Sequence, residues 1–290
     1  MTENVLAAAK INLYLHVVGK RPDGYHLLES LVVFAAMGDR ISVAPAADLT
    51  LTIDGPFAGK LAADADNLVL RAARGLQALA GVKAGASITL TKNLPIASGI
   101  GGGSADAAAT IGALLMLWDV RPDLDKVFAF ALTLGADVPV CFYGLPAVMT
   151  GVGEKITSAG WLPAETHMLL VNPLVTTPTP QVFKARTGPF SEPNPWESLF
   201  PVPEPTPQDL AAALKARRND LTEAAIGIAP VIRDVLTAIE GSDGCLLARL
   251  SGSGATCFGL YASAADAEAA RAAILAAQPG WWAVATRVAE

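Results

Sequence analysis

A glycine-rich run followed by a helical pattern is the first feature of this chain that could bind a ligand. Residues 95–105 read Pro-Ile-Ala-Ser-Gly-Ile-Gly-Gly-Gly-Ser-Ala, and residues 106–118 have the composition of a helix. Glycine leaves backbone N–H groups unobstructed, and a helix N-terminus adds unpaired N–H groups and a positive dipole end. The run therefore predicts a backbone cradle for a polyphosphate, made of Pro95, Ile96, Ala97, Ser98, Gly99, Ile100, Gly101, Gly102, Gly103, Ser104 and Ala105.

Two commoner glycine loops do not fit this run. A P-loop requires a lysine directly after its last glycine, and none follows here; a dinucleotide fingerprint requires a third glycine where the frame set by Gly99 and Gly101 has Ser104. A structural alternative stays open, in which the run is a surface loop and the Ser104 hydroxyl caps the next helix.

Lys10 and Asp137 are two charged residues in apolar surroundings. Lys10 interrupts the run from Val5 to Leu13, and Asp137 stands in a small-residue turn that continues into apolar sequence. A buried ammonium or carboxylate needs a counter-charge or hydrogen-bonding partners, so we expect these two side chains to pair. The alternatives are an edge-strand lysine with its head in water, and an aspartate that bonds its own turn.

Tyr25 and His26 follow the turn Pro22-Asp-Gly24 at the end of an expected hairpin. An aromatic ring beside a ring that can donate and accept hydrogen bonds suits a flat heterocycle. The alternative is ordinary packing beside a turn, because strands favour aromatic residues.

These residues need a scaffold of strands and helices, and the periodicity of the chain indicates an α+β layered fold. We expect a domain boundary near Pro163, giving domains 1–163 and 164–290, and an irregular connection over 173–207, which holds ten of the twenty prolines. The predicted strands are 11–17, 27–36, 41–44, 49–53, 87–92, 168–172, 245–250, 257–261 and 282–288, and the predicted helices are 67–79 behind Asp66 as cap, 106–118, 123–134, 207–216, 220–227, 230–240 and 264–277.

The composition bounds the class of protein. Hydrophobic residues make up 52% and charged residues 17% of the 290, which indicates an ordered globular chain. The net charge of −6 and the lack of a Lys/Arg cluster argue against a nucleic-acid-binding surface. We find no membrane span and no secretory signal, and Cys141, Cys245 and Cys257 lack disulfide or zinc spacing, so we expect buried reduced thiols and a cytoplasmic protein.

Four motifs in this order resemble those of the galactokinase, homoserine, mevalonate and phosphomevalonate kinase (GHMP) superfamily. They are Ala9-Lys-Ile-Asn-Leu13, the glycine run 95–105, Gly135-Ala-Asp-Val-Pro139 and Ser251-Gly-Ser-Gly-Ala-Thr256. The stretch Lys10 to Ser30 is similar to the branch that acts on a cytidine-diphosphate-linked methylerythritol. The resemblance implies a two-domain GHMP-kinase-like fold, with a strand-rich ATP-binding N-terminal domain, a ferredoxin-like α/β-plait C-terminal domain and the active site in the cleft between them.

The same resemblance implies roles for single residues. Asp137 would be the general base and Lys10 would keep it ionised and orient the substrate hydroxyl. Tyr25 and Phe183 would sandwich the cytosine, with His26 at its edge and Asn12 contacting the substrate nearby. Asn67 and Leu68 would border the adenine, Ser104 would contact a phosphate or Mg²⁺, and the loop 251–256 would close over the substrate phosphates.

The implied activity is transfer of the ATP γ-phosphoryl group, with Mg²⁺, to the 2-hydroxyl of the methylerythritol moiety in non-mevalonate isoprenoid biosynthesis. The implied partner is this small molecule, with no nucleic acid and no membrane, and the expected state is a monomer or weak homodimer. Two alternatives remain at this point: a sister kinase of the homoserine or mevalonate type, and a nucleotide-binding protein without catalysis. The presence of both Lys10 and Asp137 argues against the second.

Overall fold

The structure is a computed structural model that describes residues 2–64, 66–160, 162–163, 165–194, 196 and 205–289. The described chain divides into two compact units. The first unit takes residues from 1–9, 37–96 and 101–144, and the second takes residues from 10–36, 97–100 and 145–290. A boundary near residue 163 stays a prediction, because these units are sets of residues in contact and not continuous stretches of chain.

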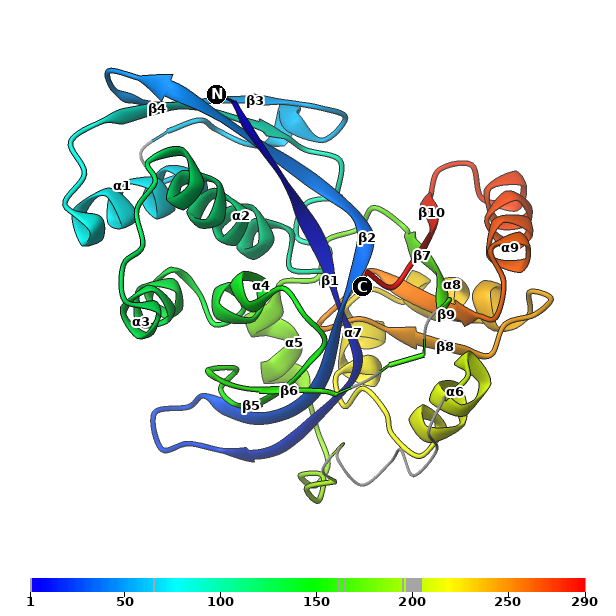
Figure 1. Cartoon of the computed structure of the whole chain (residues 1–290). Coiled ribbons are helices and arrows are strands. Elements are labelled where there is room, and N and C mark those ends of the chain that lie inside the picture. Colours follow the sequence, from blue (N-terminus) through cyan, green and yellow to red (C-terminus); the bar gives the residue numbers. More distant parts are fainter. Residues whose placement is uncertain are drawn as a thin grey trace. The chain divides into compact units, whose positions relative to one another are not determined.

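Two long strands run through both units. β1 (Glu3–Lys20) pairs with β2 (His26–Ala46), and the turn connecting them places Gly24 at a φ of 94° (Figure 1). The strands predicted over 11–17, 27–36 and 41–44 are confirmed, but the predicted ranges were too short. Residues 27–36 and 41–44 both belong to β2. The chain stays extended through Met37 to Asp39 because backbone pairing, and not local side-chain pattern, decides strand length.

The first unit covers one sheet with helices. β3 (Leu49–Asp54) lies parallel to β4 (Gly85–Thr91), which pairs antiparallel with residues 40–46 of β2. The unit's helices are α1 (Leu68–Ala80), α2 (Gly102–Leu117), α3 (Leu124–Leu134) and the short α4 (Val138–Tyr143), besides a 3₁₀ turn at Ala58–Lys60. In Figure 1, α1 and α2 lie side by side on one face of this sheet.

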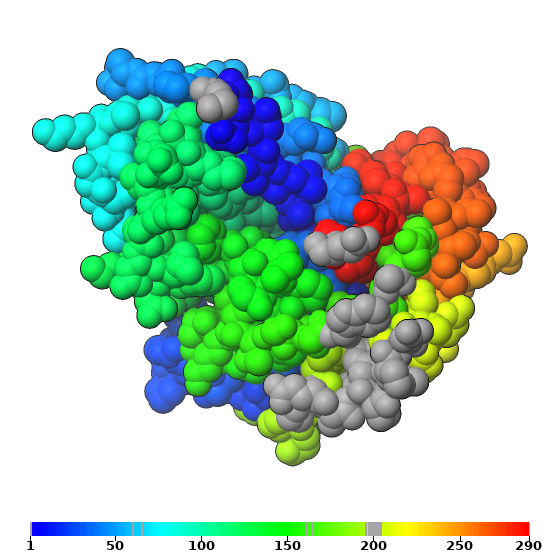
Figure 2. Space-filling model, viewed as in Figure 1, coloured from blue at the N-terminus to red at the C-terminus, as the bar shows by residue number. Residues whose placement is uncertain are grey.

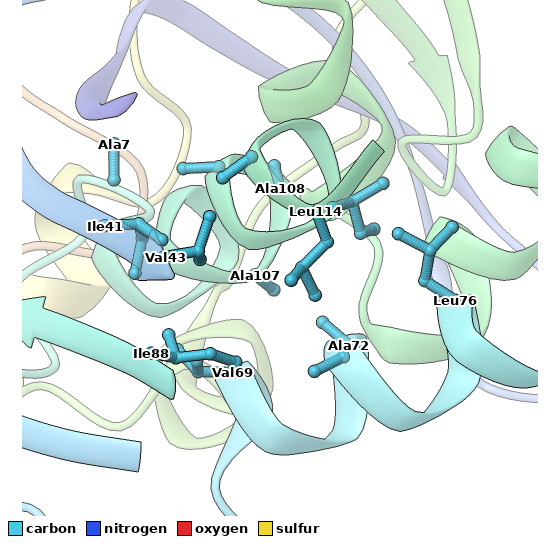
Figure 3. Packing of buried hydrophobic residues seen from close by; sticks show 14 of the residues in the cluster. Ala7, Ile41, Val43, Val69, Ala72, Leu76, Ile88, Ala107, Ala108 and Leu114 are labelled. Atoms are coloured by element: carbon cyan, nitrogen blue, oxygen red, sulfur yellow. The ribbon is translucent and has the colours of Figure 1, made fainter. Parts of the chain in front are cut away.

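The core of the first unit is built from small side chains on α2 and branched side chains on its neighbours. Ala107, Ala108 and Leu114 of α2 face Val69 and Leu76 of α1 (Figure 3). Ile41 and Val43 of β2 and Ile88 of β4 close the cluster from the sheet. The alanines let α2 approach closely, so its first turn is held on a rigid base.

The second unit contains a four-stranded antiparallel sheet in the order β10-β7-β9-β8. Its strands are β7 (His167–Asn172), β8 (Leu247–Leu250), β9 (Cys257–Tyr261) and β10 (Trp282–Arg287). Its helices are α5 (Thr179–Ala185), α6 (Pro207–Lys215), α7 (Thr222–Ile228), α8 (Val231–Glu240) and α9 (Ala264–Ala277). The outer face of α9 is open to solvent (Figure 2). Sheet and helices agree with the predicted α/β plait, and the α+β fold class is confirmed.

Several details differ from the expectations. β5 (Ala147–Gly151), which pairs with residues 28–32 of β2, and its neighbour β6 (Lys155–Ser158) were not predicted, and neither were α4 and α5. These elements are short, so periodicity over a long window does not find them. Asp66 is not the cap of α1; Asn67 is, with its Oδ1 accepting from the Val69 N–H at 3.0 Å.

Two other expectations are corrected in part. The three cysteines are free, but only Cys257 is buried, whereas Cys141 and Cys245 are half-buried. Of the proline-rich stretch 187–207, residues 195 and 197–204 lie outside the described residues. None of the helices in the described ranges is long and apolar enough to cross a membrane.

Candidate active site

The glycine run and the turn 251–256 touch each other within the second unit. The Thr256 N–H donates to the Ser98 carbonyl at 3.0 Å, and the Ser251 hydroxyl donates to the Gly99 carbonyl at 3.1 Å. A Cβ on Gly99 would lie 2.6 Å from the carbonyl oxygens of Ser251 and Gly254, and Gly99 has a φ of 75°. Gly99 is therefore required for the approach of the two loops, a role different from the ligand approach that the sequence suggested.

The turn 251–256 is itself fixed by buried polar side chains. Its Thr256 hydroxyl accepts from the Asn172 amide at 2.8 Å, and its Ser253 hydroxyl is 2.8 Å from the Thr179 hydroxyl. Asn219 donates to the carbonyls of Leu250 and Gly252. These bonds hold a glycine-rich turn in one shape, so it presents a constant surface to the glycine run.

The first turn of α2, in the first unit, has the properties of an anion site. The helix starts at Gly102, four residues earlier than predicted, and its N-cap Gly101 has a φ of 65° that glycine adopts readily. The first intrahelical bond runs from the Ala105 N–H to the Gly101 carbonyl, so the N–H groups of residues 102–104 have no acceptor inside the helix. Gly103 is exposed, and a Cβ there would meet nothing within 4 Å.

The alternative of a surface loop capped by Ser104 is wrong. The N-cap is Gly101, no side chain caps the helix, and Ser104 is the third residue of α2. Its hydroxyl thus belongs to the helical turn that carries the unpaired N–H groups, where it could contact an anion.

Lys10 and Asn12 lie on β1 and reach the glycine run through short bonds within the second unit. The Lys10 ammonium donates to the Asn12 Oδ1 at 3.0 Å, and its backbone N–H donates to the Ile100 carbonyl at 3.0 Å. The Asn12 N–H donates to the Ser251 hydroxyl at 3.2 Å, and its amide donates to Ser30 at 2.8 Å. Lys10 is only 4% exposed, so the alternative of an edge-strand lysine with its head in water is wrong.

Asp137 occupies the N-cap position of α4 in the first unit and is half-buried. Its side chain does not cap α4, and the alternative in which it bonds its own turn stays open. Asp137 and Lys10 belong to different units, so their pairing stays a prediction.

Three aromatic residues are expected at a base site. Tyr25 lies in the turn before β2, His26 is the first residue of β2, and Phe183 lies in α5. The rings of His26 and Phe183 stack with centroids 5.1 Å apart and an interplanar angle of 25°, while Tyr25 is 65% exposed. Burial, together with the positive charges of Lys20 and Arg186, lowers the pKa of His26 below its ordinary value. At neutral pH the imidazole is therefore uncharged and can both donate and accept a hydrogen bond.

Asn67 is the N-cap of α1, and Leu68 is the first residue of this helix. The Asn67 side chain accepts from Val69 and donates from its Nδ2 to the Ala62 carbonyl at 2.8 Å. The side chain is thus a helix cap, and a role for these two residues beside adenine stays a prediction.

Sequence reasoning missed a buried charged cluster of Lys92, Asp39 and Asp106. The Lys92 ammonium lies 2.5 Å from an Asp39 oxygen and 2.7 Å from an Asp106 oxygen. Burial and the neighbouring Asp39 raise the pKa of Asp106, and the two carboxylates raise the pKa of Lys92 against the effect of burial. The signal that could have found it is a charged residue next to an apolar strand: Lys92 directly follows β4 (Gly85–Thr91), and Lys10 was noticed because it interrupts an apolar run.

No group of three or more His, Cys, Asp or Glu side chains able to hold a metal ion occurs in the described part of the chain. A divalent ion that is carried mainly by phosphate oxygens and water does not need such a group.

Comparisons with known proteins identify the class. Residues 67–145 match the description "GHMP kinases N terminal domain", and residues 204–279 match "GHMP kinases C terminal". The chain is 19% identical to a homoserine kinase structure from Cytophaga hutchinsonii, with a TM-score of 0.68 over 99% of this chain and 95% of that one. That likeness supports the fold alone.

More similar proteins share one name. The 4-diphosphocytidyl-2-C-methyl-D-erythritol kinase of Paramagnetospirillum magneticum is 55% identical over 96% of each chain, and that of Cereibacter sphaeroides (strain ATCC 17029) is 52% identical over 99% of each. A crystal structure of 4-(cytidine 5'-diphospho)-2C-methyl-D-erythritol kinase is 32% identical, with a TM-score of 0.78 over 99% of this chain and 100% of that one.

Fold and site together define an ATP-dependent kinase of small molecules, with the glycine run and the turn 251–256 as its paired loops. Within this class, the chain belongs to the 4-diphosphocytidyl-2-C-methyl-D-erythritol kinase family of GHMP kinases.

Proposed function

We propose that this enzyme transfers the γ-phosphoryl group of ATP to the 2-hydroxyl of 4-diphosphocytidyl-2-C-methyl-D-erythritol, giving the 2-phosphate and ADP. The observation that carries the proposal is the chain of bonds from Lys10 through Asn12 and Ser251 to Gly99. It ties the residue expected to act on the acceptor alcohol to the loop expected to act on the nucleotide. A transferase must hold its two substrates in fixed register, and this network is suited to that task.

The nucleotide side consists of the cradle 95–105. The N–H groups at the start of α2 would bind phosphate oxygens, since a helix N-terminus combines donors with a favourable dipole. Asn67 and Leu68 would border the adenine, and Ser104 would contact a phosphate or Mg²⁺. Mg²⁺, when bound to the phosphates, would neutralise the charge that develops on their oxygens during transfer.

The acceptor side consists of Lys10 and Asp137. The substrate oxygen attacks the γ-phosphorus, the bond to the ADP oxygen breaks, and the hydroxyl proton passes to the Asp137 carboxylate. Lys10 would keep Asp137 ionised and orient the hydroxyl through its ammonium. Asn12 holds the Lys10 ammonium at a defined place, because the 3.0 Å bond joins two side chains that are both buried.

The cytosine would be recognised by Tyr25, His26 and Phe183. The Phe183 ring is half-buried and adjoins the His26 ring, so the base would lie between Phe183 and Tyr25 with His26 beside it. Tyr25 is exposed and can turn towards a ligand at small cost. A neutral His26 would bond the edge of the base, which favours cytosine over bases with another donor and acceptor pattern.

Three further proposals concern the setting of the enzyme. We place it in the cytoplasm, which the free thiols of Cys141, Cys245 and Cys257 suit because that compartment is reducing. We propose a monomer or weak homodimer without nucleic-acid or membrane partners. Sedimentation analysis over a range of concentrations tests the oligomeric state.

Phosphoryl transfer from γ-labelled ATP to a panel of alcohols tests the function. The panel contains 4-diphosphocytidyl-2-C-methyl-D-erythritol, homoserine and mevalonate, and only the first should become labelled, at its 2-position by phosphorus NMR. Labelling of homoserine or mevalonate instead would make the protein a sister kinase. Binding of ATP without labelling of any alcohol would favour a non-catalytic nucleotide-binding protein.

A further inference from the structure

The buried cluster of Lys92, Asp39 and Asp106 joins three elements of the first unit. Lys92 directly follows β4, Asp39 lies on β2, and Asp106 lies on α2. The exposed fractions of the three residues are 3%, 0% and 3%, so the charges are removed from water and need partners of opposite charge. The Lys92 ammonium is such a partner for both carboxylates, through bonds 2.5 and 2.7 Å long.

The cluster is in direct contact with the backbone of the proposed nucleotide cradle. The second oxygen of Asp39 accepts the N–H groups of Asn93 and Leu94, at 2.6 and 2.8 Å, where the chain leaves β4 towards the glycine run. A Cβ built on Gly102 would lie 3.2 Å from the Lys92 Nζ. The ammonium therefore lies close to the first residue of α2, whereas a Cβ on the next residue, Gly103, would meet open space.

Charge balance separates two roles that this ammonium could have. One ammonium between two carboxylates adds little net positive potential in front of the helix, so direct attraction of phosphate by Lys92 is not its main effect. The main effect of Lys92 is on geometry, because the cluster fixes the distance and angle of the first turn of α2 relative to β2 and β4. Asp106 keeps one oxygen buried and without a hydrogen-bond partner, a cost that packing alone would not require.

We infer that Lys92, Asp39 and Asp106 act as positioning residues that hold the first turn of α2 in the orientation that binds the ATP phosphates. The inference rests on the proposed function, since it assigns this turn to the nucleotide. Apolar side chains could join sheet and helix equally firmly, because replacing a buried ion group by well-packed apolar residues is often neutral or stabilising. Directional bonds to charged groups instead fix one arrangement.

The test compares nucleotide binding and stability in variants of the whole chain. Lys92→Met removes the ammonium, and Leu76→Ala removes core packing between α1 and α2 without touching the charges. We expect Lys92→Met to weaken binding of a non-hydrolysable ATP analogue by about tenfold to a hundredfold, as a misplacement of about 1 Å can cost. Leu76→Ala should leave the Kd within about twofold, at temperatures where circular dichroism shows both variants folded.

A steady-state readout separates positioning from general damage. Lys92→Met should raise the KM for ATP while the KM for the alcohol stays unchanged. Asp106→Asn keeps an acceptor of the same shape for Lys92 and should weaken ATP binding less than Lys92→Met but more than Leu76→Ala. This variant also carries the test if Lys92→Met does not fold.

Each outcome supports or overturns the inference. The inference is overturned if the Kd of the ATP analogue is unchanged in both Lys92→Met and Asp106→Asn. It is also overturned if Leu76→Ala weakens analogue binding as much as Lys92→Met does for the same loss of stability. A wild-type protein that binds ATP but labels none of the alcohols overturns the proposed function and leaves this inference standing. A wild-type protein that binds no ATP overturns both.

Discussion

Lys10 and Lys92 are two lysines buried to nearly the same extent in different units, and their surroundings differ. The Lys92 ammonium donates to two carboxylates, whereas the Lys10 ammonium donates to the neutral amide of Asn12. Both lysines adjoin the glycine run: Lys10 bonds the Ile100 carbonyl through its own backbone, and Lys92 lies against Gly102.

We infer that the Lys92 ammonium maintains the structure of the first unit, whereas the Lys10 ammonium takes part in the reaction. The charge of Lys92 is balanced inside its own unit, so its removal should disturb the shape of the nucleotide cradle and appear in ATP binding. The Asn12 amide holds the Lys10 ammonium in place, and we propose that this ammonium acts on Asp137 and the acceptor hydroxyl. Removal of Lys10 should therefore appear in the rate of transfer.

The largest expected effect is that of Lys10→Met. The turnover number should fall by about 10²–10⁴-fold, the usual contribution of a positioned proton-transfer group, because Asp137 would lose the charge proposed to keep it ionised. Binding of the ATP analogue should change by less than about threefold, in contrast to Lys92→Met. Single-turnover kinetics and calorimetric titration measure the two quantities, and equal losses of affinity in both lysine variants would remove the distinction.

Phe183→Ala should have the next largest effect. Loss of the stacking surface should weaken the cytidyl substrate by about 1–3 kcal/mol, as for aromatic platforms under single nucleobases, with ATP binding unchanged. Phe190→Ala is the matched control, because Phe190 follows α5 and its ring packs against Arg186, whereas Phe183 stacks with His26. Substrate titration measures both, and an unchanged Kd for Phe183→Ala means that the base does not stack there.

The Asp106 carboxyl predicts a pH dependence of stability in the Lys92 cluster. Burial and Asp39 raise its pKa to about 7 against the attraction of Lys92, whereas the unfolded chain has the ordinary value of 3.8. Between these two values the folded state holds the extra proton, so the free energy of unfolding falls as pH rises, by up to about 1.4 kcal/mol per unit.

Asp106→Asn removes this proton and isolates its effect from that of the histidines. Denaturant unfolding at intervals from pH 4 to pH 8 should show a flatter profile for the variant than for the wild-type protein. Parallel profiles would mean that Asp106 is already ionised throughout this range.

The smallest effects are expected from the two neighbouring glycines of α2. Alanine at Gly103 meets open space and should stabilise the helix by up to about 1 kcal/mol. Alanine at Gly102 places its Cβ 3.2 Å from the Lys92 Nζ and should gain less, because the bonded ammonium must shift. The melting temperatures of the two variants measure the difference in stabilisation. Equal increases would mean that the Lys92 side chain moves aside for the added methyl group without loss of stability.

The sequence predicted the class of this protein better than the borders of its elements. The strands and helices of the C-terminal sheet follow from local patterns and are confirmed, whereas the roles of Lys10 and the glycine run stay predictions. The sequence predicts the start of α2 at Asp106 because glycines are poor helix formers, yet the helix begins at Gly102, which lies near Lys92 and Leu94.

Other features could not be found because they depend on contacts between distant segments. Gly99 is required by the turn 251–256, about 150 residues away, and no local rule reveals that. The partners of Lys92 come from two other elements, so its sequence alone indicates a buried charge but not which carboxylates balance it. The stacking of His26 on Phe183 likewise depends on α5, a seven-residue helix among prolines.

Asp137→Asn tests the central claim, that a carboxylate on α4 accepts the proton of the acceptor hydroxyl. The substitution keeps the size of the side chain and removes its charge. The account predicts that single-turnover transfer to 4-diphosphocytidyl-2-C-methyl-D-erythritol slows by at least about a hundredfold while the Kd of the ATP analogue stays within about twofold. Transfer at a near-normal rate in Asp137→Asn, with both substrates bound, would contradict it.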